Sequence, residues 1–234
     1  MKVLAIIPAR GQSKGIERKN LLVLADKTLV EHSVDHALKS KLVNRVIVST
    51  EDPEIKEIAL KAGAEVPFLR PEELAGDLVL DFPVFEDVLT QLKKLDNYVP
   101  DYIVHLRPTT PHRNPQWIDS CIELLINNPN ATSVRSVSEP REHPYRVFTK
   151  DNEGYLKSIM LHEHPMPYLL RRQELPKMYY YNCVIDVTKP KTLDKYRSMT
   201  GDQMLPFIMD GENVIDIDTI RDYRMAKQFF EEKQ

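Results

Sequence analysis

The sequence has little of what marks a secreted or membrane-bound chain. Its 234 residues include only two cysteines, Cys121 and Cys183, and these lack the spacing of metal ligands. Two cysteines in a cytosolic chain are usually both reduced. The first apolar run ends at Pro8 after five residues, and no run approaches the length of a membrane span. We therefore expect a cytoplasmic protein with free thiols and no membrane partner.

A strong charge of either sign is also missing. The net charge is −3 and the pI is near 6.2, so the chain has no general attraction for nucleic acid. The common phosphate motifs are absent as well, because no GxxxxGK is followed by Ser or Thr and no GxGxxG occurs. These absences argue against a nucleic-acid partner, a P-loop kinase and a dinucleotide-dependent dehydrogenase.

What the sequence does contain is an abrupt change near its N-terminus. The apolar run over residues 3–7 is typical of a strand buried on both faces. Gly11 and Gly15 follow and would let the backbone approach a ligand. Four cations fall within ten residues: Arg10, Lys14, Arg18 and Lys19. We interpret the segment as a polyphosphate-binding loop; a solvated basic loop is the alternative.

Strand and helix patterns alternate along most of the chain. Strands are predicted near residues 3–8, 45–50, 64–69, 101–106, 131–138 and 178–187, and helices near 29–38, 53–63, 82–95, 115–126 and 220–230. This alternation predicts an α/β fold of three layers with a mostly parallel central sheet. The length suits a single domain over residues 1–234.

The alternation breaks at about residue 139. A hairpin turned at residues 151–154 is predicted there, within an inserted arm over about 139–180. So small a unit cannot bury its large apolar side chains alone, which indicates a subunit contact. These side chains are Tyr145, Phe148, Tyr155, Met160, Met166 and Tyr168.

Two aspartates lie near the C-terminus. Asp216 and Asp218 alternate in a predicted strand over residues 213–219, so both carboxylates would share one face. Such a pair repels unless a cation lies between the carboxylates, and Mg²⁺ shared with substrate phosphates is the natural ion to bind there. The alternative is that Asp218 or Thr219 only caps the following helix.

Five segments of the chain resemble a known family. Residues 8–20, PARGQSKGIERKN, resemble the opening motif PARGGSKGIPRKN of the acylneuraminate cytidylyltransferases, also called CMP-sialic acid synthetases. Residues 70–81 resemble the family's Arg-Pro-x-x-Leu-Ala-x-Asp with a second Asp four residues on. Residues 106–113 resemble Leu-Gln-Pro-Thr-Ser-Pro-Leu-Arg, residues 171–176 resemble Arg-Arg-Gln-Asp-Leu-Pro, and residues 215–219 resemble Val-Asp-Ile-Asp-Thr. The enzymes that activate ketodeoxyoctonate open with a different motif and match less well.

The resemblance implies an enzyme that transfers CMP from CTP to the anomeric hydroxyl of a nonulosonic, sialic-type acid and releases pyrophosphate. It implies Mg²⁺ as cofactor, a role in surface glycan biosynthesis, and a homodimer whose arm reaches the neighbouring active site. The implied catalytic residues are Arg10, Lys19, Asp216 and Asp218, the last two holding the metal. The implied nucleotide-binding residues are Ala9, Arg10, Gly11, Ser13, Lys14, Lys19, Asn20, Arg70 and Asp77. The implied sugar-acid residues are Arg107, Thr109, Arg172 and Asn182.

Several positions leave alternatives open. Arg107 replaces the family glutamine that contacts the sugar acid, and Cys183 replaces a glycine, where it either narrows the pocket or fills core. Arg70 precedes Pro71, which could simply start a helix. His105 is interpreted as a strand residue with a satisfied hydrogen bond, and at least one of the three tyrosines at 179–181 is expected to be buried. Three arm histidines fit no standard zinc pattern: His143, His162 and His164.

Two other functions compete with cytidylyl transfer. The run Asp216-Ile217-Asp218 is the DxD pattern of metal-dependent glycosyltransferases, although the N-terminal loop suits a triphosphate better than a diphosphate sugar. A non-catalytic nucleotide-binding module would bind CTP and release no product.

Overall fold

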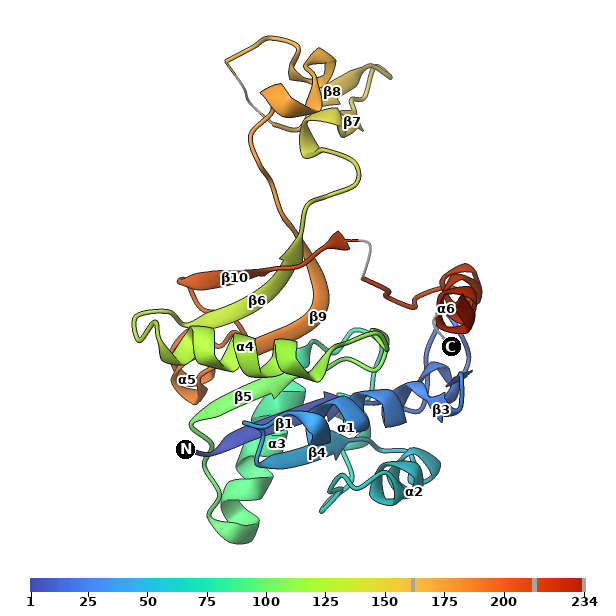
Figure 1. Ribbon diagram of the computed structural model, residues 1–234, viewed down its shortest axis with the longest axis vertical. Coiled ribbons are helices and arrows are strands. Elements are labelled where there is room, and N and C mark those ends of the chain that lie inside the picture. The colour runs from blue at the N-terminus through green and yellow to red at the C-terminus, as the bar shows by residue number, and fades with distance from the viewer. Residues whose placement is uncertain (161–162, 212–213, 233–234) are drawn as a thin grey trace.

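The computed structural model describes residues 1–160, 163–211 and 214–232. Its centre is a six-stranded sheet in the order β10-β6-β9-β5-β1-β4 (Figure 1). Five strands are parallel, and only β9 runs antiparallel to its neighbours. The strands are β1 (Val3–Pro8), β4 (Arg45–Ser49), β5 (Tyr102–His105), β6 (Ser133–Ser138), β9 (Tyr180–Thr188) and β10 (Met204–Ile208). The predicted α/β class with a mostly parallel sheet is confirmed.

Helices cover both faces of this sheet. Side chains alternate along β1, so Val3, Ala5 and Ile7 pack on one face with α1 (Leu29–Lys39), α2 (Pro53–Lys61) and α4 (Pro115–Ile126). Leu4 and Ile6 pack on the other face with α3 (Asp81–Asp96) and α5 (Pro190–Tyr196). All five of these strand side chains are fully buried. The predicted three layers are therefore present.

A separate small cluster lies at the carboxyl end of β1. It joins the ribbon β2 (Val23–Leu24) and β3 (Lys27–Thr28) to α6 (Ile220–Glu232). Its buried members are Ile16, Leu24, Leu29, Ile217 and Ala226. This cluster brings the C-terminal segment against the N-terminal loop, and Figure 1 shows α6 beside β3.

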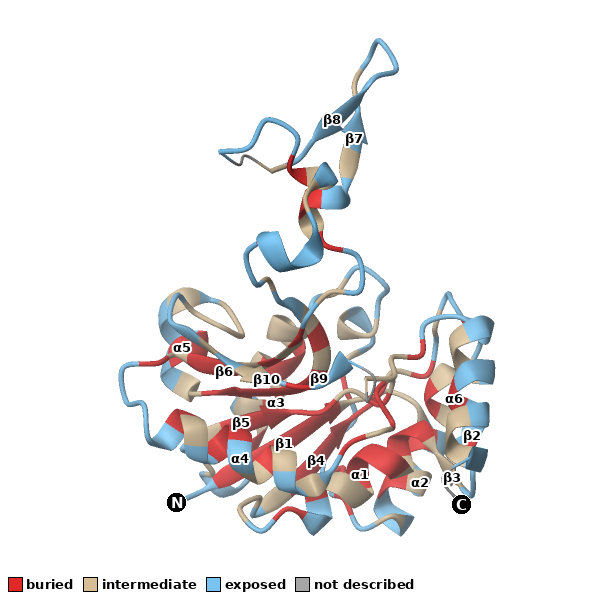
Figure 2. Cartoon of the chain, turned by 45° about the horizontal axis from the view of Figure 1, so that its top comes forward, coloured by how far each residue is buried: buried red, intermediate tan, exposed pale blue. Residues whose placement is uncertain are grey.

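The chain between β6 and β9 leaves the core and forms the arm. Figure 2 shows the arm projecting from the sheet with mostly exposed residues. The predicted hairpin is present as β7 (Phe148–Lys150) and β8 (Leu156–Ser158). Tyr145 packs against His143 at a ring distance of 5.5 Å and is buried. Of the other predicted side chains, Tyr155 and Met166 are exposed, whereas Phe148, Met160 and Tyr168 are half-buried.

Two predicted strands are wrong. Residues 64–69 make a single bridge, between Glu65 and Ile47, because the segment turns away after one residue pair. Residues 214–219 form no strand, and Asn213 lies outside the described residues. That segment instead docks on a loop through the hydrogen bond from Ile217 N to Thr109 O, at 2.8 Å.

Other details also differ from expectation. None of the tyrosines at 179–181 is fully buried, and Tyr179 and Tyr180 are each 41% exposed. The reason is that β9 comes from the arm, so its first residues lie outside the core and only its later residues are buried. The strand β10, the helix α5 and the β2–β3 ribbon were not predicted from the sequence. Among the described residues, no helix is both long and apolar enough to traverse a lipid bilayer.

Candidate active site

A cavity of about 240 Å³ opens beyond the carboxyl ends of β1 and β5. Ligands of open α/β sheets usually bind at this edge. The lining comes from three segments and consists of Pro8, Arg10, Gln12, Ser13, Lys19, Asn20, Arg70, Leu74, Gly76, Asp77, Val79, Asp81, Val84, Arg107, Pro108 and Thr109. Three of the five predicted motifs therefore meet here.

The loop after β1 is held by its own polar groups and by close approach of other segments. Asn20 Nδ2 donates to Arg10 O at 2.8 Å, and Gly11 N donates to Glu51 Oε1 at 2.7 Å. A Cβ at Gly11 would lie 2.6 Å from Asp52 Oδ2, and one at Gly15 would lie 2.4 Å from the carbonyl oxygen of Asp218. Both glycines were predicted to let the backbone approach a ligand. In the structure the space beside them is filled by other parts of the chain, Asp52 and the backbone of Asp218.

The four cations of this loop pair with three different sets of acidic residues. Arg10 and Lys14 both pair with Asp77, at 2.7 and 3.2 Å. Lys19 pairs with Asp218 at 2.8 Å. Arg18 is bonded to Asp52 and Glu54 at the start of α2 and lies off the cavity lining. Only Arg10 and Lys19 contribute to the lining itself.

The C-terminal aspartates lie beside these N-terminal cations. Asp218 contacts Lys19 directly. Asp216 Oδ1 is buried and lacks a hydrogen-bond partner among the described residues. Burial raises the pKa of Asp216, and the nearby Asp218 raises it further, while Thr109, Lys19 and Arg107 oppose this shift. The two ends of the chain therefore converge at one place.

Arg107 lies deeper in the cavity and is held by three side chains. Its Nη2 donates to Asp81 Oδ2 at 2.7 Å, and its Nη1 donates to Asp186 Oδ2 at 3.0 Å and to the Tyr181 hydroxyl at 2.6 Å. Burial opposes the charge of Arg107, but Asp186, Tyr181 and Asp81 together raise its pKa above the ordinary value.

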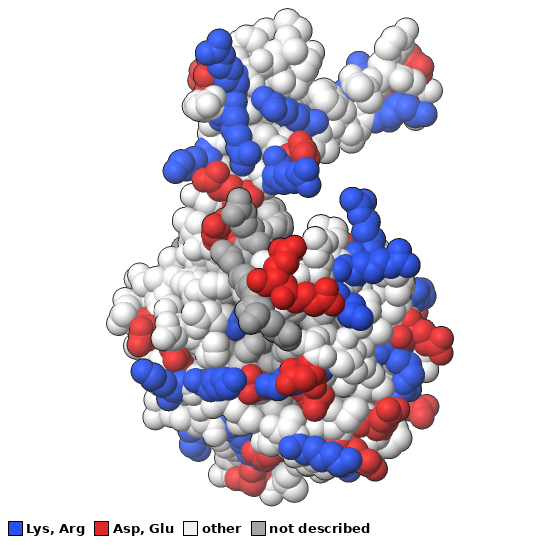
Figure 3. All heavy atoms as spheres, turned by 45° about the vertical axis from the view of Figure 1, so that its right-hand side comes forward, with Lys and Arg blue, Asp and Glu red and all other residues white. Residues whose placement is uncertain are grey.

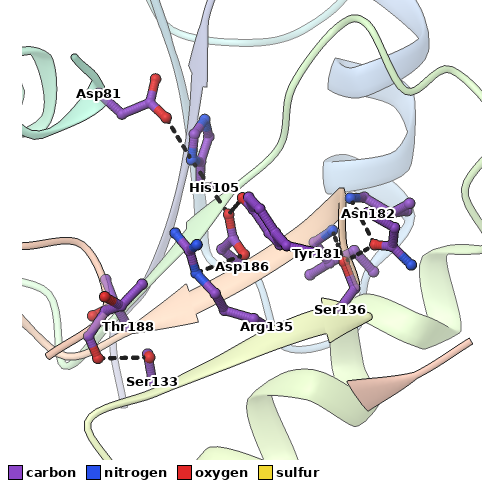
Figure 4. A network of polar contacts seen from close by, with 12 residues as sticks. Asp81, His105, Ser133, Arg135, Ser136, Tyr181, Asn182, Asp186 and Thr188 are labelled. Carbon is purple, nitrogen blue, oxygen red and sulfur yellow. Dashed lines mark hydrogen bonds and ion pairs between the residues drawn. The ribbon is translucent and has the colours of Figure 1, made fainter. Parts of the chain in front are cut away.

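His105 lies within the same network, between two carboxylates (Figure 4). Its Nδ1 is 3.7 Å from Asp186 and 3.9 Å from Asp81, and its Nε2 has no hydrogen-bond partner among the described residues. The expected satisfied hydrogen bond is therefore absent. Burial, assisted by Arg107, lowers the pKa of His105 to about 4, so the ring is neutral at pH 7. Arg135 adds a second cation, 3.5 Å from Asp186 and 4.1 Å from the centre of the Tyr181 ring.

The remaining predicted residues lie in different surroundings. Ser13, Asp77 and Thr109 line the cavity, whereas Ala9 is fully buried in the main core. Arg70 lines it too, but its guanidinium donates to Ser49 O at 2.5 Å and to Ser49 Oγ at 3.0 Å.

Two predicted sugar-acid residues lie off the cavity of their own chain. Asn182 is buried, with its amide bonded to Ser136 and Ser138. Arg172 lies in the arm, where Nη2 donates to Pro140 O at 3.1 Å. A second hollow, of about 970 Å³, adjoins Arg172 at the base of the arm.

Besides His105, which was interpreted as a strand residue, four members of the network were not predicted as site residues: Asp81, Asp186, Tyr181 and Arg135. A detectable signal existed for Asp186, because a carboxylate inside the apolar run Val184–Val187 needs a buried cationic partner.

Cys183, which directly precedes this run, has a backbone φ of 61°. The family's glycine at this position thus corresponds to a left-handed backbone conformation, an explanation that neither open alternative for Cys183 included.

A family model described as cytidylyltransferase matches residues 4–230. The chain belongs to the cytidylyltransferase family. Among curated relatives, this cytidylyltransferase is 32% identical to the CMP-N,N'-diacetyllegionaminic acid synthase of Legionella pneumophila, covering 100% of this chain and 98% of the relative. It is 31% identical to a pseudaminic acid cytidylyltransferase of Campylobacter jejuni, covering 97% and 95%. The family predicted from the motifs is confirmed.

The fold also agrees with solved structures. A CMP:2-keto-3-deoxy-manno-octonic acid synthetase complexed with CTP matches with a TM-score of 0.73 at 16% identity, covering 100% of both chains. A cytidylyltransferase from Leptospira borgpetersenii matches with a TM-score of 0.64 at 19% identity, covering 99% of this chain and 87% of that one. At these identities the likeness concerns the fold alone.

Proposed function

We propose that this cytidylyltransferase transfers CMP from CTP to the anomeric hydroxyl of a nonulosonic, sialic-type acid. The hydroxyl oxygen attacks the α-phosphorus, the bond to the β-phosphate breaks, pyrophosphate leaves, and the hydroxyl proton is released. The observation that carries the proposal is the contact between Lys19 and Asp218 at the cavity. It brings the cation that we propose to bind phosphate beside the carboxylate that we propose to bind metal, from opposite ends of the chain.

The nucleotide end of the site is built from the loop after β1. Arg10 and Lys19 would hold the triphosphate and neutralise the leaving pyrophosphate, with Lys14 assisting from the rim. In phosphoryl transfer the protein contributes mainly positioning and charge stabilisation. Arg10, Lys14 and Lys19 all pair with aspartates, so phosphates bound there would compete with these partners. Asn20 fixes the loop through the carbonyl of Arg10.

Asp216 and Asp218 form the metal end. Both offer oxygen ligands, and the unpartnered buried Oδ1 of Asp216 fits a role as a cation ligand. No group of three or more potential protein ligands occurs among the described residues, so the triphosphate and water would supply the other ligands. Mg²⁺ bound there would polarise the α-phosphate and lower the pKa of the attacking hydroxyl.

The sugar acid would occupy the part of the cavity beside Arg107 and Thr109. Two carboxylates neutralise Arg107, so Arg107 offers directed hydrogen bonds more than net charge. The arm carries further cations, and Figure 3 shows Lys and Arg side chains on its surface. We include a homodimer in the proposal, with Arg172 of one subunit reaching the site of the other, and a cytoplasmic location where CTP is available.

The test is pyrophosphate release from CTP and Mg²⁺ with a panel of acids: N-acetylneuraminic, N,N'-diacetyllegionaminic and pseudaminic acid. We expect stoichiometric pyrophosphate and a CMP-sugar detected by mass spectrometry with at least one acid, and neither product without acid. CTP binding without pyrophosphate from any nine-carbon acid would favour the non-catalytic module. Consumption of a sugar nucleotide without CTP would favour the glycosyltransferase.

A further inference from the structure

Arg113, between β5 and α4, is a buried cation that the proposed reaction does not use. It is 3% exposed and lies outside the cavity lining. Burial lowers its pKa to about 9, and none of the described carboxylates is within ion-pair distance of it. A buried charge without a counter-ion is costly unless hydrogen bonds compensate for it. The partners of Arg113 therefore matter.

Each of the five guanidinium hydrogens has an acceptor, and these come from three parts of the fold. Nε donates to Val184 O on β9 at 2.8 Å. Nη2 donates to Thr110 Oγ1 at 2.6 Å and to Arg107 O at 3.2 Å. Nη1 donates to Ser33 Oγ at 3.4 Å and to His36 Nδ1 at 3.3 Å, both on α1. Arg113 thus ties β9 and α1 to the loop after β5.

Arg113 and two of its partners, Ser33 and Thr110, all donate hydrogen bonds to one carbonyl oxygen, that of Arg107. Besides Arg113, it accepts hydrogen bonds from Ser33 Oγ at 3.2 Å, from Thr110 Oγ1 at 3.1 Å and from Thr110 N at 3.3 Å. Carboxylates hold the other end of Arg107. The backbone and the side chain of this cavity residue are therefore both fixed.

The same loop also anchors the C-terminal aspartates. Thr109 O accepts from Ile217 N at 2.8 Å, and the Thr109 side chain bonds Asp216. A shift of the loop would therefore move Arg107 and Asp216 together.

We propose that Arg113 is a positioning residue: it holds residues 107–110 so that the sugar-acid end and the metal end of the site keep their mutual geometry, and it touches neither substrate. Its effect on catalysis rests on the proposed function, whereas its effect on the loop does not.

A substrate-free measurement tests the effect on the loop. In Arg113→Lys the compact ammonium cannot reach five spread acceptors, so we expect faster hydrogen exchange at the amides of Thr110 and Ile217. Arg45→Lys is the matched control, because Arg45 pairs with Glu65 and Asp96 away from this loop, and it should leave both amides unchanged. Unchanged exchange in folded Arg113→Lys would overturn the proposal.

A milder variant covers the case in which Arg113→Lys does not fold. Thr110→Val keeps the side-chain shape but removes the hydroxyl that joins Arg113 to Arg107 O. It should accelerate exchange at the Ile217 amide, and protection equal to that of the wild type would count against the positioning role.

Kinetics then separate positioning from a general structural role. In Arg113→Lys, calorimetric CTP affinity should stay within about threefold of the wild type, because Arg10 and Lys19 lie on another loop. The KM for the sugar acid should rise about tenfold or more, since small misplacements are costly. Equal losses of CTP affinity and sugar-acid KM would overturn the assignment. A wild type that releases no pyrophosphate defeats the proposed function, while the exchange result still decides on the loop.

Discussion

Lys19 and Asp218 are 199 positions apart in the chain and 2.8 Å apart in space. The Lys19 side chain is only 13% exposed, whereas that of Asp218 is 71% exposed. Lys19 is thus a partly desolvated cation at the cavity wall, where its electrostatic effect on a phosphate is larger than in water. Its ammonium also offsets the effect of Asp218 on the pKa of Asp216.

Lys19→Met should lower kcat about 100-fold or more, because it removes a preorganised charge from the leaving pyrophosphate. Folding should be nearly unaffected, since a pair with an exposed partner contributes at most about 1 kcal/mol. Pyrophosphate release and a thermal melt measure the two effects. Lys27→Met, which removes a surface pair with Asp35, is the control. A rate for Lys19→Met within twofold of that control would exclude Lys19 from the site.

Cys183 tests a different residue-scale point, backbone strain. Its φ of 61° costs an L-residue about 1–2 kcal/mol, and glycine avoids that cost. Cys183→Gly should therefore raise the free energy of unfolding by about 0.5–1 kcal/mol relative to Cys183→Ala, which keeps the strain. Urea titration of both variants makes the comparison. Greater stability of the alanine variant would show that side-chain packing, not φ, decides this position.

At the scale of elements, the C-terminal aspartates depend on docking rather than on secondary structure. Ile217 lies between Asp216 and Asp218, is fully buried, and joins a cluster separate from the main core. The hydrogen bond that its backbone N–H donates to Thr109 O completes the attachment. A docked irregular segment can detach without global unfolding, because its contacts are few.

Ile217→Ala should therefore raise the Mg²⁺ concentration for half-maximal activity about tenfold, with only a small change in thermal midpoint. Ile122→Ala is the control, since Ile122 is equally buried but belongs to the main core. It should cost about 2–5 kcal/mol of stability and leave the metal requirement unchanged. If both variants shift the metal requirement equally, the docking argument fails.

The contrast between regular elements and docked segments also explains which parts of the fold could be predicted from the sequence. Continuous apolar runs predicted β1, β4 and β5, and helical spacing predicted α1 to α4, because local pattern and burial agree there. The strand β10 forms by pairing with β6, and residues 214–219 dock on the loop that contains Thr109. Both depend on contacts with distant parts of the chain, which a local sequence pattern does not reveal. The motifs located Lys19 and Asp218, but the buried partners of Arg107 depend on strand order: Asp186 faces Arg107 only because β9 lies beside β5.

At the scale of the whole molecule, the arm exposes several large apolar side chains that a single subunit does not cover. Tyr155, Leu156 and Leu169 are each about two-thirds exposed. Single exposed apolar residues are ordinary, whereas several on one small projecting unit indicate an interface. The arm also carries Arg172 away from its own cavity, as expected if it serves a second copy.

Sedimentation should give a mass near twice 27.2 kDa. A double variant of the arm, Leu156→Asp with Leu169→Asp, should sediment as a monomer, because two charges oppose burial at an apolar contact. Leu60→Asp, which adds a charge on α2 at a leucine 48% exposed, should remain a dimer. A wild-type monomer at micromolar concentration would remove the dimer from the proposal.

Subunit mixing then asks whether the arm works across the interface. Arg172→Ala and Lys19→Met should each be nearly inactive alone, the first for lack of an arm cation and the second for lack of a phosphate cation. After dissociation and reassociation, half of the dimers would be mixed, and each mixed dimer would combine one intact core with the partner's intact arm. A two-fold symmetric dimer therefore predicts recovery of about a quarter of the wild-type rate. If Arg172 acts within its own subunit, every site carries one defect, and mixing restores nothing.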